Sequence, residues 1–466
     1  MQHRAPRTIA IVGAGFSGTL VAVNLLRRPP VESTRIVLIE RAPTVGCGVA
    51  YARHDYRYIL NVPASRMSAS STVPEEFLNF ARTVAPDASG QDFLPRDVYG
   101  KYLRELLDRS AVTARPSVRL EFLRDTATGI RQSKGGAAFQ LALERGGEMN
   151  ADDVVLALGN PPPRVPPGAE AVRTFPGYVN DPWAVPNHRP PAGPVLMIGS
   201  GLTMVDVVCA SVATDPARTI HVLSRHGLLP LSQTDVGVGA AEEGGLDRAL
   251  KSATSLRMIV RAFARTARQA TADGRDWRDV IMQVRHRAPQ IWHRLAAADR
   301  RRFLRHVRAY WDVHRHRFPE PVRSQLKRLE ASGQMTIHAG RLLRLEAAGS
   351  QIRARWRARG ERDDRATLVS AVYNCTGPDY DLSQTADPLW RSLLESGLAT
   401  QDELRLGLLT GPNGEVLGRD GLATRGLFYV GPMLRAAYWE ATAVAELRGH
   451  AERLAEYLAG SIPRPQ

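Results

Sequence analysis

The sequence predicts an α/β fold with two Rossmann-like domains and a helical insertion, because a strand, a glycine turn and a helix follow one another twice. The first copy begins at Thr8 and the second at Val195, and each leads into another short apolar strand. Residues 235–330 lack this pattern and are rich in helix-forming residues. With 466 residues, 44% of them hydrophobic, the chain is long enough to bury a core in each of two domains.

The first βαβ unit occupies residues 8–40. A short β-branched strand runs into GAGFSG, an apolar helix stops at Pro29, and the strand RIVLIE ends on Glu40. In a dinucleotide-binding turn the three glycines permit the tight turn, the approach of a pyrophosphate and close packing of helix on strand, while the acid accepts from ribose hydroxyls. The predicted nucleotide contacts are Gly13, Gly15, Ser17, Gly18 and Glu40.

The second unit repeats this pattern with two differences. Gly199 and Gly201 form the turn, with Thr203 in the first helical turn, but Met204 stands where the third glycine would be. The next strand ends at Arg225 rather than at an acid. The loss of the carboxylate removes repulsion against a 2′-phosphate, and a guanidinium can pair with that phosphate. The second unit is therefore predicted to bind NADPH, with NADH as a possible substitute.

The second strand of the first unit ends on an acid, and that of the second unit ends on an arginine. This difference indicates that the protein holds one nucleotide, FAD, and that a second nucleotide reduces it. Two further apolar strands, Asp153–Gly159 and Ala371–Gly377, each close on a glycine and are expected to lead the chain between the domains. The predicted organisation is an FAD-binding domain (1–185, completed by 376–466), an NAD(P)H-binding domain (192–234, completed by 331–375) and the helical insertion (235–330).

Two helices outside the βαβ units are predicted from local patterns. Thr72 followed by Glu75 has the spacing of a capping box, which places a helix start at Thr72. In the insertion, apolar side chains recur at helical spacing opposite a row of arginines, which predicts one amphipathic helix through Phe303, Leu304, Val307, Tyr310 and Trp311.

Composition narrows the function. The formal net charge is +15, but aromatic residues make up only 6% and no zinc-ligand spacing or basic-aromatic RNA-binding motif occurs, so a nucleic-acid partner is not expected. The three cysteines are far apart, which favours neither a disulfide framework nor a metal site. No long apolar segment and no signal-peptide pattern is found. A cytoplasmic protein without a membrane partner is expected.

Five further motifs extend from the first domain to the C-terminal part of the chain. They are Gly46–Tyr51, Tyr58–Ser68, Phe93–Leu103, Trp311–Arg317, and Leu427–Pro432 with Trp439–Thr442. In this order they resemble a large bacterial family of FAD/NAD(P)-binding proteins. Members of that family with an assigned activity include an FAD-dependent urate hydroxylase and an aspartate N-monooxygenase that forms nitrosuccinate.

The resemblance implies further cofactor contacts. Gly13, Gly15, Gly18 and Glu40 match the FAD fingerprint of the family, and the stretch Asn61–Met67 matches the segment expected beside the isoalloxazine ring. Gly431 and Pro432 stand where many flavoproteins place a Gly-Asp pair against the ribityl chain. The aspartate of that pair is missing here, so the ribityl contact falls to another group.

The preferred hypothesis is a flavin monooxygenase. NADPH would reduce FAD, O2 would give a flavin C4a-hydroperoxide, and one oxygen atom would pass to a small, electron-rich, anionic substrate. Arginine richness suits such an anion. Urate hydroxylation is favoured, and N-hydroxylation of an aspartate-like amino acid is the alternative. An FAD/NAD(P)H oxidoreductase without oxygenation and a nucleotide-binding protein without turnover are the competing hypotheses.

The insertion is predicted to close over the flavin and to complete an anion pocket. The candidate catalytic residues are Asn61, Trp311, His314 and Arg315. No metal is expected, because His314 and His316 are two residues apart and would diverge on a helix. Cys47 has no second cysteine nearby for disulfide reduction, so a packing role is predicted.

Overall fold

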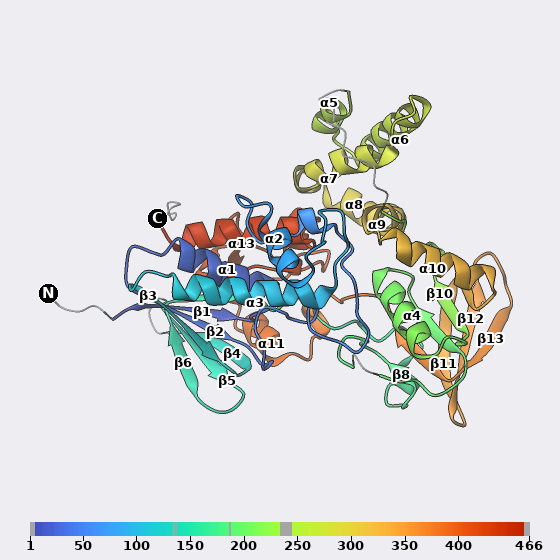
Figure 1. The fold of residues 1–466 in the computed structure, drawn as a ribbon, viewed down its shortest axis with the longest axis horizontal. Coiled ribbons are helices and arrows are strands. Elements are labelled where there is room, and N and C mark those ends of the chain that lie inside the picture. The colour runs from blue at the N-terminus through green and yellow to red at the C-terminus, as the bar shows by residue number, and fades with distance from the viewer. Residues whose placement is uncertain (1–4, 134–135, 137, 186–187, 234–244, 461–466) are drawn as a thin grey trace.

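The computed structural model describes residues 5–133, 136, 138–185, 188–233 and 245–460 (Figure 1). The first sheet has the strand order β15-β16-β7-β1-β2-β3. All neighbours in it are parallel except β15 and β16. Its strands are β1 (Arg7–Val12), β2 (Thr34–Ile39), β3 (Val118–Leu123), β7 (Asp153–Leu156), β15 (Glu415–Leu417) and β16 (Ala423–Tyr429).

Helices cover one face of the first sheet and a small sheet covers the other. Alternate strand residues face the two layers, as the two-residue period of a strand requires: Ile9 and Ile11 pack under the helices, whereas Ala10 and Val12 pack on the opposite side. The helices are α1 (Phe16–Arg27), α2 (Glu76–Val84), α3 (Arg96–Val112) and α13 (Val444–Leu458). The opposite layer consists of β4 (Ala127–Gln132), β5 (Phe139–Leu143), β6 (Glu148–Ala151) and α11 (Pro388–Glu395).

The second sheet has the order β13-β12-β11-β10-β9-β14-β8. Strands β8 to β11 and β14 are parallel where they pair, and β12 and β13 extend the sheet as antiparallel strands. Its strands are β8 (Tyr178–Val179), β9 (Val195–Ile198), β10 (Ile220–Ser224), β11 (Met335–Ala348), β12 (Gln351–Ala358), β13 (Asp364–Val369) and β14 (Ala371–Asn374). Helices α4 (Leu202–Thr214) and α10 (Glu320–Ala331) share a hydrophobic core with one of its faces.

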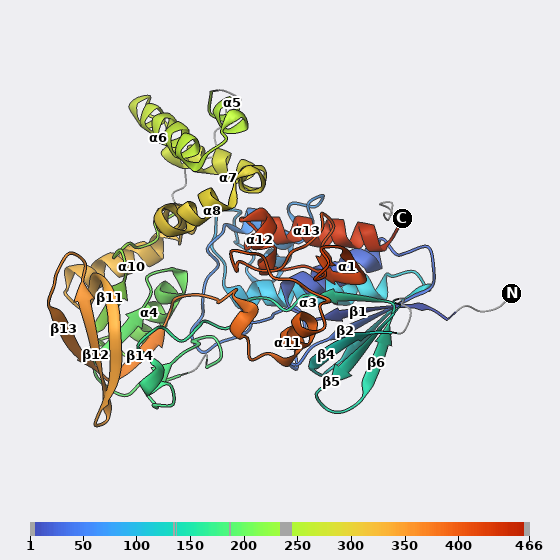
Figure 2. The same cartoon turned by 180° about the vertical axis from the view of Figure 1, so that it is seen from behind.

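A further group of helices forms an arm that projects away from the two sheets (Figures 1 and 2). They are α5 (Gly245–Ser252), α6 (Leu256–Ala272), α7 (Trp277–Arg294), α8 (Ala297–Arg302) and α9 (Arg308–Arg315). The first three share a separate apolar core that includes Leu250, Ile259 and Val284. A second cluster, of Trp292, Leu406, Ala436 and Trp439, joins the base of the arm to the segment around α12 (Arg435–Tyr438) in the first domain.

The prediction of an α/β fold with two Rossmann-like domains and a helical insertion is confirmed. The capping box is wrong: α2 begins at Glu76, and the side chain of its N-cap residue, Glu75, makes no capping hydrogen bond. The predicted helix through Phe303 and Trp311 is present, with a π-helical turn at Phe303–Val307 between α8 and α9. Within the described residues, no helix is both long and apolar enough to span a bilayer.

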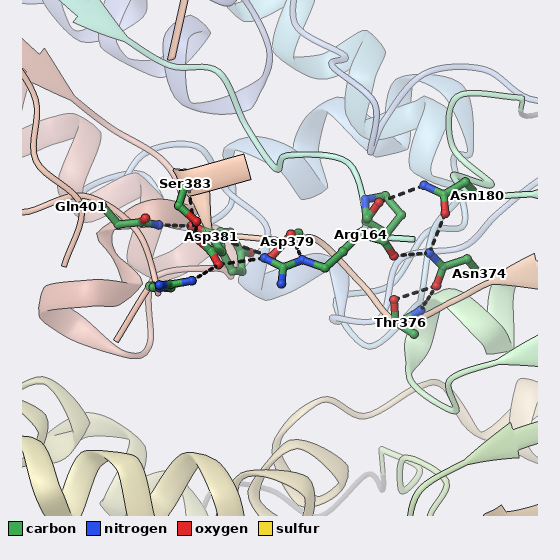
Figure 3. A network of polar contacts seen from close by, with 11 residues as sticks. Arg164, Asn180, Asn374, Thr376, Asp379, Asp381, Ser383 and Gln401 are labelled. Carbon is green, nitrogen blue, oxygen red and sulfur yellow. Dashed lines mark hydrogen bonds and ion pairs between the residues drawn. The ribbon is translucent and has the colours of Figure 1, made fainter. Parts of the chain in front are cut away.

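Two linkers run side by side between the domains, and a polar network holds them together (Figure 3). In the linker after β7, Arg164 donates to Asp379 (2.7 Å) and Asp381 (2.8 Å) of the linker after β14. Asn374, at the end of β14, donates to the backbone oxygen of Arg164 and to the side chain of Asn180. Burial disfavours ionisation of Asp381, but hydrogen bonds from Ser383 and Arg164 outweigh it and lower its pKa. The two linkers between the domains are therefore held together by hydrogen bonds and ion pairs.

Candidate functional site

The first glycine turn requires glycine at two positions for packing and at a third for access. Gly13 has φ +99° and a Cβ there would overlap the carbonyl of Ala157 on the neighbouring strand, while a Cβ at Gly18 would overlap the Gly13 carbonyl. At Gly15 a Cβ would meet only Gly48, whose Cα lies at 3.5 Å, in ordinary contact. Gly15 is thus not required by the fold itself, which leaves close approach of a ligand as the reason for a glycine.

The amino-terminal end of α1 fits a diphosphate. Its N-cap residue is Gly15, and no described side chain caps the helix, so its first N–H groups point outward beside the glycine turn. Ser17, in the first helical turn, is 7% exposed. Uncapped N–H groups beside Gly15 match the chemistry of an anion. These residues fit the pyrophosphate of a dinucleotide.

Glu40 follows β2 and has two roles. One carboxylate oxygen accepts from Ala14 N (2.8 Å), within the glycine turn, and the other accepts from Ala42 N (2.9 Å). Each oxygen keeps a further lone pair, so the carboxylate can also accept from ribose hydroxyls. Glu40 therefore orders the glycine turn and keeps acceptor capacity that a ribose could use.

The second glycine turn has the same backbone. Gly199 has φ +102° and a Cβ there would press on the Cys375 carbonyl, whereas a Cβ at Gly201 would meet no atom within 4 Å. The N-terminal end of α4 lacks a side-chain cap among the described residues, and Thr203 is half-buried in its first turn. Met204 is fully buried in the core beneath the sheet. This turn too offers open N–H groups to an anion.

Two arginines stand at the end of β10. Arg225 is exposed, and burial lowers the pKa of the adjacent His226, as do the charges of Arg359 and Arg225. Arg359 follows β12 and lies far from Arg225 in the sequence. Sequence spacing therefore could not predict that the two arginines lie near each other. Both guanidinium groups lie where a 2′-phosphate is expected.

The segment Asn61–Met67 lies where the first domain meets the second. Met67 is 1% exposed and packs into the core under α1, while Arg66 is exposed. The backbone oxygen of Asn61 accepts from Gln233 Nε2 at 3.2 Å. A small cavity of about 30 Å³ borders Asn61, Arg96, Asp206 and Phe318.

A half-buried ion pair crosses the domain boundary beside that cavity. Arg96 of α3 donates to both oxygens of Asp206 on α4, at 3.1 and 2.8 Å. The guanidinium also lies over the rings of Tyr58 and Trp183, at 5.5 and 5.7 Å from their centroids. Sequence patterns could not show this pair, because its members belong to helices of different domains.

The C-terminal segment brings Gly431 and Pro432 to the end of β16. Gly431 has φ +152°, and a Cβ there would meet the Tyr429 hydroxyl at 2.7 Å. Pro432 is buried, and the following Met433 N donates to the same hydroxyl at 3.0 Å. The described contacts place no side-chain carboxylate at Pro432, so they show no substitute for the aspartate of the Gly-Asp pair.

Trp311 and Arg315 both contact Glu440 of this segment. Trp311 Nε1 donates to one oxygen at 2.8 Å and Arg315 Nε to the other at 2.9 Å. Burial opposes ionisation of Glu440, but the charge of Arg315 and the Trp311 hydrogen bond outweigh it and lower its pKa. His314 instead donates to Tyr310 O and packs against Trp277, within the insertion. The structure thus brings together two of the four candidate catalytic residues, Trp311 and Arg315, away from His314.

The three cysteines are all buried and free. Cys47 lies 3.5 Å from a guanidinium nitrogen of Arg104 and is 7% exposed. Burial raises the pKa of Cys209 to about 12. Among the described residues, no group of His, Cys, Asp and Glu side chains is placed to hold a metal ion.

Comparisons with known proteins agree with this geometry. Residues 10–161 match a family model described as FAD-NAD(P)-binding. The sequence matches no curated protein. The fold, however, is similar to solved structures along nearly its whole length.

Three of these structures are N-hydroxylases or monooxygenases. The Kutzneria sp. 744 ornithine N-hydroxylase, solved with reduced FAD, NADP+ and L-ornithine, is 13% identical (TM-score 0.62; 97% of this chain, 99% of that one). The L-lysine 6-monooxygenase from Pseudomonas syringae is 17% identical (0.66; 98% and 99%). The cadaverine monooxygenase from Erwinia amylovora, bound to FAD, is 12% identical (0.66; 98% and 95%).

Proposed function

We propose that this protein is an FAD- and NADPH-dependent monooxygenase that hydroxylates the amino nitrogen of a small amino acid. The observation that carries the proposal is similarity of fold over 97% or more of the chain to amine-hydroxylating monooxygenases, with the helical insertion included. Both nucleotide turns retain the open N–H groups that such an enzyme needs. The reaction would consume one NADPH, one proton and one O2 and release NADP+ and water with each hydroxylamine.

The first domain would hold FAD. The open end of α1 and Gly15 would bind its pyrophosphate, and Glu40 would accept from its ribose while keeping the turn ordered. The chemistry that FAD supplies when bound is acceptance of hydride from NADPH and activation of O2. Arg225 on the second domain would pair with the 2′-phosphate of NADPH, which distinguishes that nucleotide from NADH.

The insertion would keep water from the reaction site. Its base contacts the first domain through Trp292, Phe303 and Trp439, whose rings pack at 4.8 to 5.8 Å between centroids. The bonds of Trp311 and Arg315 to Glu440 fix the same junction. These contacts support a positioning role for the two residues. Substrate contacts by Asn61 and His314 stay predictions.

Amino-acid N-hydroxylation replaces urate hydroxylation as the favoured reaction. The similar structures are of enzymes that act on ornithine, lysine or cadaverine, and all three substrates present an amine. Electron transfer to a protein disulfide would need an accessible redox cysteine, and the three cysteines here are buried. An N-hydroxylase therefore agrees with more of the structure than a disulfide reductase does.

The test is a substrate panel on FAD-loaded enzyme. NADPH oxidation is followed with L-aspartate, L-ornithine, L-lysine, cadaverine and urate, with and without O2, and products are analysed by mass after reaction in ¹⁸O2. We expect an amino acid to gain one labelled oxygen in step with NADPH consumed. A labelled product from urate alone would contradict the proposal. NADPH oxidation that is equally fast without O2 would indicate an oxidoreductase that does not oxygenate.

A further inference from the structure

One guanidinium of the first domain bonds directly to a helix of the second. Arg96, the first residue of α3, donates to both carboxylate oxygens of Asp206 on α4, at 3.1 and 2.8 Å. The two side chains are only 17% and 16% exposed. A bidentate pair of this kind fixes the direction of approach as well as the distance. The pair therefore constrains how the two domains are oriented.

Arg96 is bound to the start of the segment that is predicted beside the flavin ring. Its backbone N donates to Tyr58 O at 2.8 Å, and its Nε donates to Ile59 O at 3.0 Å. A β-bridge between Ile59 and Pro95 adds a further backbone contact. Asn61, the first residue of the segment, lies two positions after Ile59. The position of Arg96 is therefore coupled to that of the flavin segment.

Asp206 is coupled in the same way to the second glycine turn. Helix α4 begins directly after Gly201, and Asp206 lies in its second turn. The backbone hydrogen bonds of an α-helix hold residues this close together as one rigid unit. A displacement of Asp206 would therefore also displace the open N–H groups beside Gly201, which are expected to bind the diphosphate of NADPH.

The aromatic rings around Arg96 also come from both domains. Tyr58 belongs to the first domain, whereas Trp183 lies between β8 and β9 of the second sheet. Their ring centroids are 5.4 Å apart in an edge-to-face arrangement, and the guanidinium lies within 6 Å of both. His54 of the first domain packs on Trp183 at 6.1 Å. These contacts hold the guanidinium in place at the domain boundary.

Beside the ion pair the two domains do not pack completely. The cavity of about 30 Å³ next to Arg96 and Asp206 is lined by Ile59 of the first domain and by Leu202 and Val205 of α4. It has room for a water molecule. Apolar side chains that border a gap lose part of the close contact by which a packed interior fixes its geometry. The alignment of the domains at this point therefore depends on the ion pair.

Two other contacts near the domain boundary constrain the orientation less. The network of Arg164 joins one linker to the other (Figure 3), which leaves the second domain free to turn about the linkers. Gln233 donates to Asn61 O at 3.2 Å, but a single hydrogen bond between neutral groups is weaker than a charge-assisted bidentate pair.

We propose that Arg96 and Asp206 are positioning residues that keep the second glycine turn aligned with the flavin segment for hydride transfer. This inference rests on the proposed function for the placement of the two nucleotides. In the transfer a C–H bond of NADPH breaks, NADP+ is left, and FAD takes up the hydride as FADH−. The rate of such a step depends steeply on the distance and angle between donor and acceptor. Neither residue has to touch a nucleotide for this role.

The test compares Asp206→Ala with Glu121→Ala in FAD-loaded protein. Asp206→Ala removes the bond between the domains and leaves the bonds of Arg96 to Tyr58 and Ile59 in place. Glu121→Ala is the matched control, because Glu121 accepts a bidentate pair from Arg35 within the first domain. Flavin reduction at saturating NADPH is followed without O2 by stopped flow. We expect Asp206→Ala to be slower by about tenfold or more and Glu121→Ala to match wild type. FAD content and the Kd for NADP+ should stay within about twofold in both.

A second measurement reports the orientation of the domains without turnover. Spin labels are attached at Val112→Cys, which is 86% exposed at the end of α3, and at Lys327→Cys, which is exposed on α10. The three native cysteines are buried. Double electron–electron resonance should give one narrow distance distribution when Asp206 is present and a broader or shifted one with Asp206→Ala. The same distribution in both would overturn the proposal.

Asp206→Asn serves as the second variant if Asp206→Ala fails to fold. It has the same shape but loses the charge and one acceptor oxygen, so flavin reduction should slow by about threefold. A wild-type reduction rate in the variant that folds would overturn the proposal. Weaker NADP+ binding with an unchanged maximal rate would also overturn it and assign Asp206 to the nucleotide site.

The same experiments separate this inference from the proposed function. If flavin reduction depends on Asp206 but no amino acid is hydroxylated, the proposed function fails and the positioning role stands. If an amino acid is hydroxylated and Asp206→Ala is reduced at the wild-type rate, the positioning role fails and the proposed function stands.

Discussion

The two glycine turns share a backbone but differ where the third glycine is expected. In the first domain a Cβ at Gly18 would overlap the Gly13 carbonyl, because helix and turn meet directly. In the second domain the matching residue, Met204, is fully buried against apolar neighbours. A third glycine is therefore needed only where the helix packs this closely on the turn. The second turn leaves the first N–H groups of α4 without a side-chain cap although it lacks that glycine.

The two units also differ at the end of the second strand. Glu40 is tied by hydrogen bonds to Ala14 and Ala42, so the first turn is ordered through the residue that would bind the ribose. Arg225 is exposed at the surface of the second domain. A tied site suits a nucleotide that stays bound, and an open site suits one that exchanges in every turnover. This contrast supports FAD in the first domain and NADPH in the second.

The largest expected effect comes from Gly15→Val. Since a Cβ at Gly15 meets only Gly48 at van der Waals distance, the variant should fold, but its side chain would occupy the place of the pyrophosphate. We expect colourless protein with a wild-type circular dichroism spectrum. A full flavin absorbance at 450 nm in purified Gly15→Val would place FAD elsewhere.

The matched change in the second domain is Gly201→Val. A Cβ at Gly201 meets nothing within 4 Å, so the variant should fold and keep its FAD. Reduction by NADPH should slow by about a hundredfold or more, because the branched side chain blocks the approach of the diphosphate to the open end of α4. Stopped-flow bleaching of the flavin measures this rate, and dithionite should still reduce the flavin normally. Loss of FAD from Gly201→Val would contradict the proposal that the first turn binds FAD and the second binds NADPH.

Arg225→Ala tests the end of the second unit. The NADPH KM should rise about tenfold through loss of a charge-assisted bond to the 2′-phosphate, while the NADH KM should scarcely change. Steady-state kinetics with both nucleotides give the comparison. Equal losses with NADPH and NADH would show that Arg225 supports the fold instead.

The smallest effect is expected for Arg359→Ala. Arg359 lies near His226 and Arg225 but is exposed, so solvent screens its charge and the NADPH KM should rise by about threefold. The same assay in low and moderate salt should show a larger effect at low salt. If the NADPH KM rose selectively in Arg359→Ala and not in Arg225→Ala, the roles of the two arginines would be reversed.

Local sequence patterns are enough to predict the two turns and the fold. Gly13, Gly18 and Gly199 are dictated by the backbone within each unit, and the acid of the first unit lies at a fixed spacing. These features depend on residues close in sequence. The capping-box prediction at Thr72 fails although it is also local. Glu76 lies 2.7 Å from both Tyr102 and Arg27, and these tertiary contacts accompany the later helix start.

Contacts between domains cannot be predicted in the same way. Arg96 and Asp206 are 110 residues apart, and Arg315 and Glu440 are 125 apart. Whether an arginine of the motif Trp311–Arg317 is paired or free depends on which distant acid reaches it. The pattern alone favours Arg315 as a residue of the substrate pocket. The structure shows Arg315 paired with Glu440 and Arg317 without a described partner.

The central claim is that a nucleotide on the second domain reduces a nucleotide on the first. Anaerobic titration of the FAD-loaded protein with NADPH tests it most directly, because the flavin absorbance at 450 nm reports reduction without any choice of substrate. We expect complete bleaching by one equivalent of NADPH, with slower bleaching by NADH. FAD-loaded protein that keeps its full absorbance in excess NADPH would contradict it and would favour a nucleotide-binding protein without turnover.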